Sequence, residues 1–191
     1  MVKLINMKRI LLIFLIILII IPAVEAENVT IKSVNFEIPH QYEHGTLKES
    51  SYVYGNGLTF RILNLDDSKN LKINFGGDVD GAKSVDQTQI AGHDAVVILR
   101  EYNAKQYTTV YFATGDKIFL ICFNDTSVND DITKVIEKTP EQTMSHDDFA
   151  SRLKQALNDY KNQVAQENAD LRQEEYSKNN NRHNNFFFFI R

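Results

Sequence analysis

Apolar and polar positions alternate over short runs along much of the chain, which predicts a series of β-strands. Three runs rich in β-branched and aromatic residues, at 95–102, 107–113 and 117–123, are separated only by short turn segments. Such spacing predicts an antiparallel meander. The last run is apolar at every position from Ile118 to Phe123, so we expect a central strand with both faces covered.

The meander also predicts a shared core. The side chains that we expect to be buried together are Val97, Val110, Phe112, Ile118, Leu120 and Cys122. No cation or histidine lies near Cys122 in the sequence to activate its thiol. We therefore interpret the single cysteine as a buried core residue, which is the common environment of a free thiol.

Several further strands are expected before the meander. Short alternating runs begin at Val29 and end at Ile38, and the runs 52–54 and 58–63 flank Gly55-Asn56-Gly57, which predicts a hairpin. Another strand is expected at 71–75. Leu71, Ile73 and Phe75 alternate with polar residues, and Gly76-Gly77 would end that strand. The acidic stretch Asp78–Asp86 contains a glycine and is expected to form a loop.

After residue 123 the apolar residues recur at helical spacing. Ser127, with an acidic residue three positions later, predicts the start of a short helix. Ser145, followed by Asp148, predicts the start of a long helix. Its apolar face is Phe149, Leu153, Leu157, Tyr160 and Val164. Docking of this face onto the sheet is the favoured interpretation, and self-association through heptad spacing is the alternative.

The chain ends in an asparagine-rich tract, for which we expect no regular structure. We expect the whole of 177–191 to be a disordered tail, closed by the apolar cluster Phe186–Ile190. The preceding residues, 27–176, are expected to form a single α+β domain. Its predicted architecture is a twisted antiparallel sheet with C-terminal helices packed on it.

The first 26 residues have the order of a secretory signal. Lys3, Lys8 and Arg9 precede an uninterrupted apolar run from 10 to 21, and Val24-Glu25-Ala26 provides a cleavage site. The alternative is an uncleaved N-terminal anchor. Both predict that the rest of the chain lies outside the cytoplasm, secreted or attached to the membrane.

Composition excludes several classes of protein. The chain has 191 residues, 43% of them hydrophobic, which is enough for one domain with a core. A net charge of -4 excludes a strongly basic nucleic-acid-binding protein. A single cysteine excludes an internal disulfide framework and a cysteine-rich zinc site.

The order of several short motifs carries a resemblance to a known family. Phe36-Glu37-Ile38-Pro39 comes first, and Ile90-Ala91-Gly92-His93 follows a glycine-marked hairpin. Val110-Tyr111-Phe112 then stands opposite Lys117–Ile121. Over roughly residues 29–138 the chain resembles the small exported α/β/α domains related to PsbP and DcrB, as in short exported proteins of methanogenic archaea. The resemblance implies an antiparallel sheet with helices on its faces and no shared catalytic centre.

Two sets of residues are candidates for metal binding. His40 and His44 are four residues apart, as in helical zinc motifs, but they follow Pro39 and the intervening glutamate is displaced. The Asp78–Asp86 stretch lacks the glycine and glutamate positions of an EF-hand loop. His146 and the two aspartates after it are interpreted as first-turn residues of the long helix.

No catalytic, cofactor-binding or metal-binding residue is therefore assigned. The predicted function is that of a non-catalytic interaction module at the cell surface or elsewhere outside the cytoplasm. Its partner would be a protein or a cell-envelope component, with membrane contact through residues 10–21 or Phe186–Ile190 and no nucleic acid. The alternative is a metal-dependent hydrolase that uses His40, His44 and the Asp78–Asp86 loop.

Overall fold

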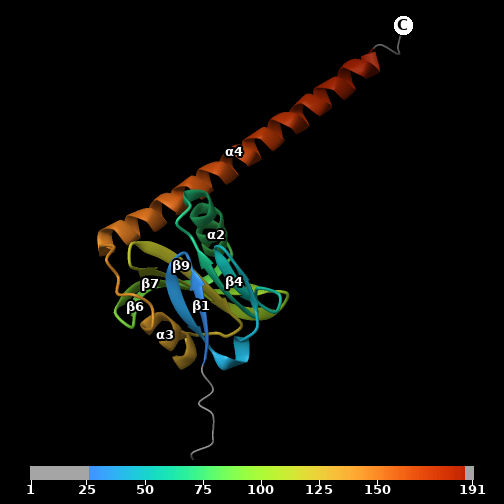
Figure 1. Ribbon diagram of the computed structural model, residues 1–191. Coiled ribbons are helices and arrows are strands. Elements are labelled where there is room, and N and C mark those ends of the chain that lie inside the picture. The colour runs from blue at the N-terminus through green and yellow to red at the C-terminus, as the bar shows by residue number, and fades with distance from the viewer. Residues whose placement is uncertain (1–25, 188–191) are drawn as a thin grey trace, which may run out of the picture.

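A seven-stranded antiparallel sheet organises the part of the chain that the computed structural model describes, residues 26–187. The expected signal segment up to residue 25 lies outside the described residues, as do residues 188–191, which include the last three residues of the apolar cluster. In spatial order the sheet consists of β3 (Thr46–Lys48), β4 (Ser51–Tyr54), β5 (Phe60–Asn64), β9 (Lys117–Phe123), β8 (Lys105–Thr114), β7 (His93–Tyr102) and β6 (Ala82–Ile90) (Figure 1).

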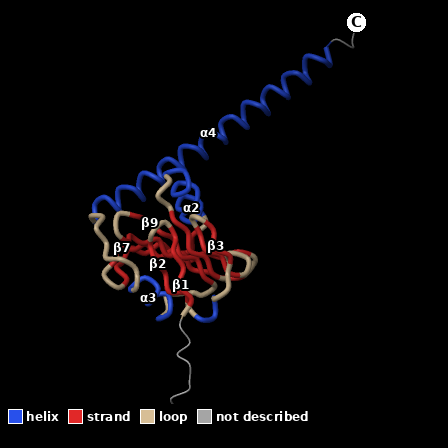
Figure 2. Tube along the Cα trace, viewed as in Figure 1, coloured by secondary structure: helices blue, strands red, loops and turns tan. Residues whose placement is uncertain are grey.

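Different elements cover the two faces of this sheet (Figure 2). One face packs against helices α2 (Ser68–Asp80) and α4 (His146–Phe187). The other face packs against helix α3 (Asp130–Glu137) and the hairpin of β1 (Glu27–Ile31) and β2 (Val34–Ile38). A 3-10 turn, η1 (His40–Tyr42), leads from this hairpin to β3.

The predicted meander and its central strand are confirmed. Strands β7, β8 and β9 pair antiparallel in succession, and β9 is the middle strand of the seven. Its side chains alternate between the two cores: Phe119, Ile121 and Phe123 face the β1–β2 hairpin, whereas Ile118, Leu120 and Cys122 face α2 and α4.

This alternation corrects the expected core. Val110 and Phe112 are fully buried, but on the hairpin side, where Val97 is only partly buried. The six residues therefore do not form one cluster, because successive side chains of a strand point to opposite faces of the sheet.

The predicted strand at Leu71–Phe75 is wrong, because these residues form part of helix α2. The side chain of Asp67 caps the helix by accepting a hydrogen bond of 2.7 Å from the Lys69 N–H. Leu71 and Phe75, four residues apart, are buried on one side of the helix, while Ile73 is 48% exposed.

The expected loop over Asp78–Asp86 is also wrong. Asp78 and Asp80 belong to the last turn of α2, and β6 begins at Ala82. Gly76 and Gly77 do not end an element but lie inside α2.

Helix boundaries agree with the sequence in one case and differ in two. Ser145 accepts a hydrogen bond of 3.1 Å from the Asp148 N–H at the start of α4, as predicted. The shorter helix α3 is capped by Asn129 rather than Ser127. Helix α4 also continues to Phe187, so Ser177–Asn185 is helical where we expected no regular structure.

Only the first part of α4 packs on the domain. Phe149, Leu153 and Ala156 are buried, and Tyr160 lies against α2 at Gly76. Farther along, Leu171 and Tyr176 are 59% and 71% exposed, and the helix extends away from the sheet (Figure 1). Among residues 26–187, no helix is both long and apolar enough to cross a membrane.

Candidate functional site

A groove lies where α4 begins, beside strands β6 and β7. It has a volume of about 510 Å³, which is within the usual range for ligand pockets. Its walls are mainly apolar toward α4 and polar toward the sheet edge. They consist of Gln87, Thr88, Gln89, Asp94, Ala95, Val96, His146, Phe149, Ala150 and Leu153.

A buried carboxylate organises one end of the groove. The side chain of Asp94 is 5% exposed, and Nδ1 of His146 lies 3.1 Å from its Oδ1. Gln89 Nε2 donates to the same oxygen at 3.1 Å, and Gln142 Nε2 donates to Oδ2 at 2.7 Å. Gln142 also accepts a hydrogen bond of 2.7 Å from the Asp94 N–H.

These contacts determine the charge of Asp94. Burial by itself would raise the pKa of the carboxyl, but the hydrogen bonds from Gln142, Gln89 and His146 outweigh burial and lower the pKa below its usual value. Asp94 is therefore a stable anion at neutral pH, held beside the N-terminus of α4, where negative charge is favourable.

Local pairing explains how the residues meet. Gln89 and Asp94 are opposite each other in the β6–β7 ladder, so the hairpin places their side chains together. Gln142 arrives from the connection between α3 and α4, which is attached to the β8–β9 turn. There, the Gly115 carbonyl accepts from the N–H groups of Thr143 and Met144 at 2.8 and 2.9 Å.

Asp94 orients the imidazole ring of His146, whose side chain is 72% exposed. A general base of this kind needs a hydroxyl or water to activate. The nearby hydroxyls are engaged elsewhere: Ser145 donates to Asp148 at 2.7 Å, and Thr88 donates to a backbone carbonyl. Within the described residues, the hydrogen bonds around Asp94 attach the start of α4 to the sheet beside an apolar groove.

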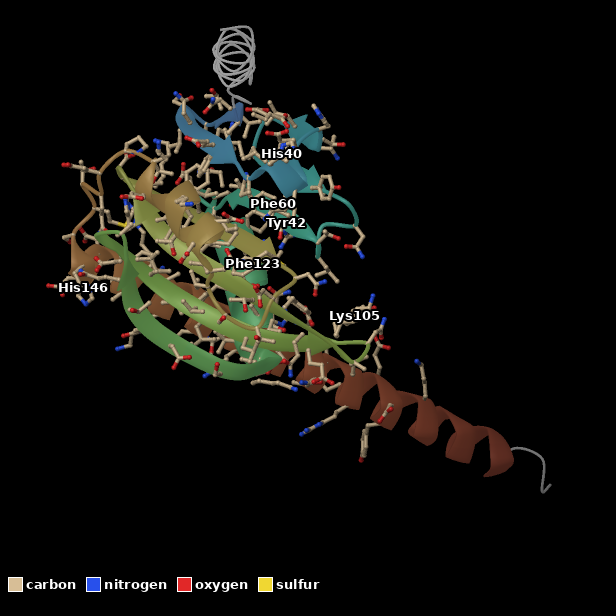
Figure 3. All side chains as sticks on the ribbon, turned by 90° about the horizontal axis from the view of Figure 1, so that it is seen from below. His40, Tyr42, Phe60, Lys105, Phe123 and His146 are labelled. Carbon is tan, nitrogen blue, oxygen red and sulfur yellow. The ribbon has the colours of Figure 1, made fainter. Side chains whose placement is uncertain are left out.

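The sequence-predicted histidines lie elsewhere. His40 has a 78% exposed side chain with Nδ1 2.9 Å from Glu43, and the His44 N–H donates to Glu27. Figure 3 shows His40 and His146 at separate parts of the molecule. No group of three His, Cys, Asp or Glu side chains placed to hold a metal ion occurs among residues 26–187.

Asp78 is held on the opposite face of the sheet from His40. It pairs with Arg100, and the Tyr111 hydroxyl donates to its Oδ2 at 2.7 Å. Burial first, and then the Asp78 charge, raises the pKa of Tyr111 well above its usual value. The structure therefore does not bring Asp78 and the two histidines together, and Asp78 is occupied by contacts between α2 and the sheet.

The expectation of a buried thiol is confirmed. Cys122 is 2% exposed, and burial raises the pKa of its thiol to about 11. A thiol with this pKa carries little thiolate at neutral pH, so it is a poor nucleophile.

Sequence reasoning missed the Asp94 network. His146 was interpreted only as a first-turn residue, and neither Asp94 nor Gln142 stands in a motif. Comparisons with models of protein families, with curated proteins and with solved structures found no match to this chain.

Proposed function

We propose that the chain is a non-catalytic interaction module that acts outside the cytoplasm and binds a protein partner through α4. The observation that carries this proposal is the length of α4 that stands clear of its own domain. Beyond Val164, the described side chains of the helix are all exposed.

A helix gains most of its stability from packing of one face, because isolated helices are only marginally stable in water. The distal part of α4 has no such packing, and its support comes from pairs along the helix, such as Gln163 with Glu167 and Gln166 with Asp170. Leu171 and Tyr176 remain exposed on it. A partner that covered these side chains would supply the missing packing.

Two further expectations belong to this proposal. The three-layer arrangement, with α2 and α4 on one face of the sheet and the β1–β2 hairpin with α3 on the other, supports a PsbP-like domain. The basic residues, apolar run and cleavage site at 1–26 support export. Membrane attachment would then come from residues 10–21.

The test is site-specific photo-crosslinking in cells that express the full chain. A photoreactive residue in place of Leu171 should give a discrete adduct that excess unlabelled chain competes away. The matched control is Ile73 on α2, which is also apolar and 48% exposed but packs within the domain's helical layer. Equal adducts at both positions, or none at Leu171, would overturn the proposal.

A further inference from the structure

We infer that the groove beside α4 receives the Phe186–Ile190 segment of a second copy of this chain, so that copies assemble head to tail. This inference rests on the proposed interaction function and names its partner. It joins the two features of α4 left unexplained by the fold: the apolar groove at its first turns and the phenylalanine cluster at its far end.

The groove and the cluster of one chain are kept apart by the helix itself. Leu153 lines the groove, and α4 continues without a break to Phe187. At a rise of 1.5 Å per residue, this length of helix spans about 50 Å. The next three residues reach at most roughly 10 Å farther even when fully extended. The cluster therefore cannot return to the groove of its own chain.

The groove matches such a segment in shape and polarity. Val96, Phe149, Ala150 and Leu153 give it an apolar wall, and its volume of about 510 Å³ suits large side chains. Its other wall is formed by β6, the last strand of the sheet. The outer edge of a terminal strand offers backbone donors and acceptors to an added segment, here the residues that follow the end of α4 at Phe187.

The charges around the groove and those that flank the phenylalanine cluster are of opposite sign. Glu141, Asp147 and Asp148 are exposed around the start of α4, next to the groove-lining His146. The phenylalanine cluster is preceded by Arg182 and followed by Arg191 in the sequence. Basic residues on both sides of an apolar segment fit an apolar groove with an acidic border.

The expected contact joins unlike surfaces, the groove of one copy and the segment of another. Such a contact closes into a ring of two or more copies, or continues as a filament. The full chain should therefore give a series of oligomers that grows with concentration.

Disulfide trapping tests the contact directly. Two single variants of the full chain, Ala150→Cys and Phe189→Cys, are mixed under mild oxidation. Ala150 lines the groove, and the native Cys122 is buried and should remain silent. We expect a mixed disulfide between the two variants. The matched control replaces Ala169, an exposed alanine on the distal part of α4, and should give at least ten-fold less product.

Other outcomes would overturn the inference. A chain carrying both Ala150→Cys and Phe189→Cys should form oligomers, and a disulfide within one chain would show that the segment folds back. Absence of the mixed disulfide would exclude the contact. Loss of the disulfide when vesicles of anionic and zwitterionic lipid are added, with the chain sedimenting on them, would identify a membrane as the preferred site.

A second measurement covers the case in which a groove variant does not fold. A fluorescent peptide of residues 180–191 should bind the full chain at least ten-fold more weakly after Ala150→Trp, which fills the groove. Ala169→Trp, the same change on the distal helix, should leave binding unchanged. If Leu171 gives an adduct with a different protein while both groove tests fail, the interaction function stands and the self-assembly is wrong.

Discussion

The contact between α2 and α4 gives a prediction in which two adjacent glycines respond with opposite signs. A Cβ atom at Gly76 would lie 2.3 Å from both Cβ and Cγ of Tyr160. Cβ is fixed to the helix backbone, so a change of tyrosine rotamer cannot relieve this overlap, and α4 itself would have to move. A Cβ atom at Gly77 meets nothing within 4 Å.

The magnitudes follow from two effects. Replacing a helical glycine by alanine stabilises by roughly 0.5–1 kcal/mol. Overpacking a close contact costs about 1–3 kcal/mol, and a fixed atom at this distance belongs at the upper end. Gly76→Ala should therefore lower the free energy of unfolding by about 2–2.5 kcal/mol, whereas Gly77→Ala should raise it by roughly 0.5–1 kcal/mol.

Urea denaturation followed by far-ultraviolet circular dichroism measures both variants on the same scale. The difference between them is more reliable than either value, because unfolded-state effects of the same substitution largely cancel. If Gly76→Ala stabilises as much as Gly77→Ala, α4 does not cross α2 at this glycine and the position assigned to α4 is wrong.

The remaining predictions concern the core and the two buried carboxylates. Leu120→Ala should lower stability by about 2–5 kcal/mol, because Leu120 is fully buried; an unchanged melting temperature would contradict its central position. Asp78→Ala removes the acceptor of the buried Tyr111 hydroxyl and the ion-pair partner of Arg100, whose side chain is 25% exposed, and should cost about 1–3 kcal/mol in thermal or urea denaturation. The exposed Asp80→Ala is its control and should change stability by less than about 0.5 kcal/mol. Asp94 has a lowered pKa, so its contribution is present at neutral pH and lost as pH falls through the native pKa. Asp94→Asn should flatten the decline in stability measured from pH 7 toward acid, and an unchanged pH profile would refute the role assigned to this carboxylate.

The sequence predicts the meander well because its information is local. Short turns between long β-rich runs leave antiparallel neighbours as the only simple arrangement, and the fully apolar β9 then has to be central. Helix α2 was misread because Leu71, Ile73 and Phe75 satisfy a strand pattern, while Leu71 and Phe75 alone satisfy a helical one. Only the 48% exposure of Ile73 in the folded chain decides between them.

The glycine pair in α2 was misread for a related reason. Glycine is unfavourable inside a helix, so Gly76-Gly77 reads as an end. At Gly76 the reason for glycine is a tertiary contact, the close approach of Tyr160, which lies far along the chain, whereas no contact accounts for Gly77. The Asp94 network was hidden in the same way, because Asp94 and Gln142 are separated by 48 positions and neither residue type indicates a site by itself.

Whether the asparagine-rich tract is helical or flexible determines which contacts the phenylalanine cluster can make. Had Ser177–Asn185 been a flexible linker, the phenylalanine cluster could have folded back over its own domain, and ordering of each linker residue would have cost roughly 1–2 kcal/mol. Because α4 instead continues as one helix from His146 to Phe187, its first turns line a groove while its end lies about 50 Å away. Because the helix is continuous, it holds the phenylalanine cluster of one chain away from that chain's own groove. It is this continuity, more than any single side chain, that makes binding between molecules the consistent interpretation of α4.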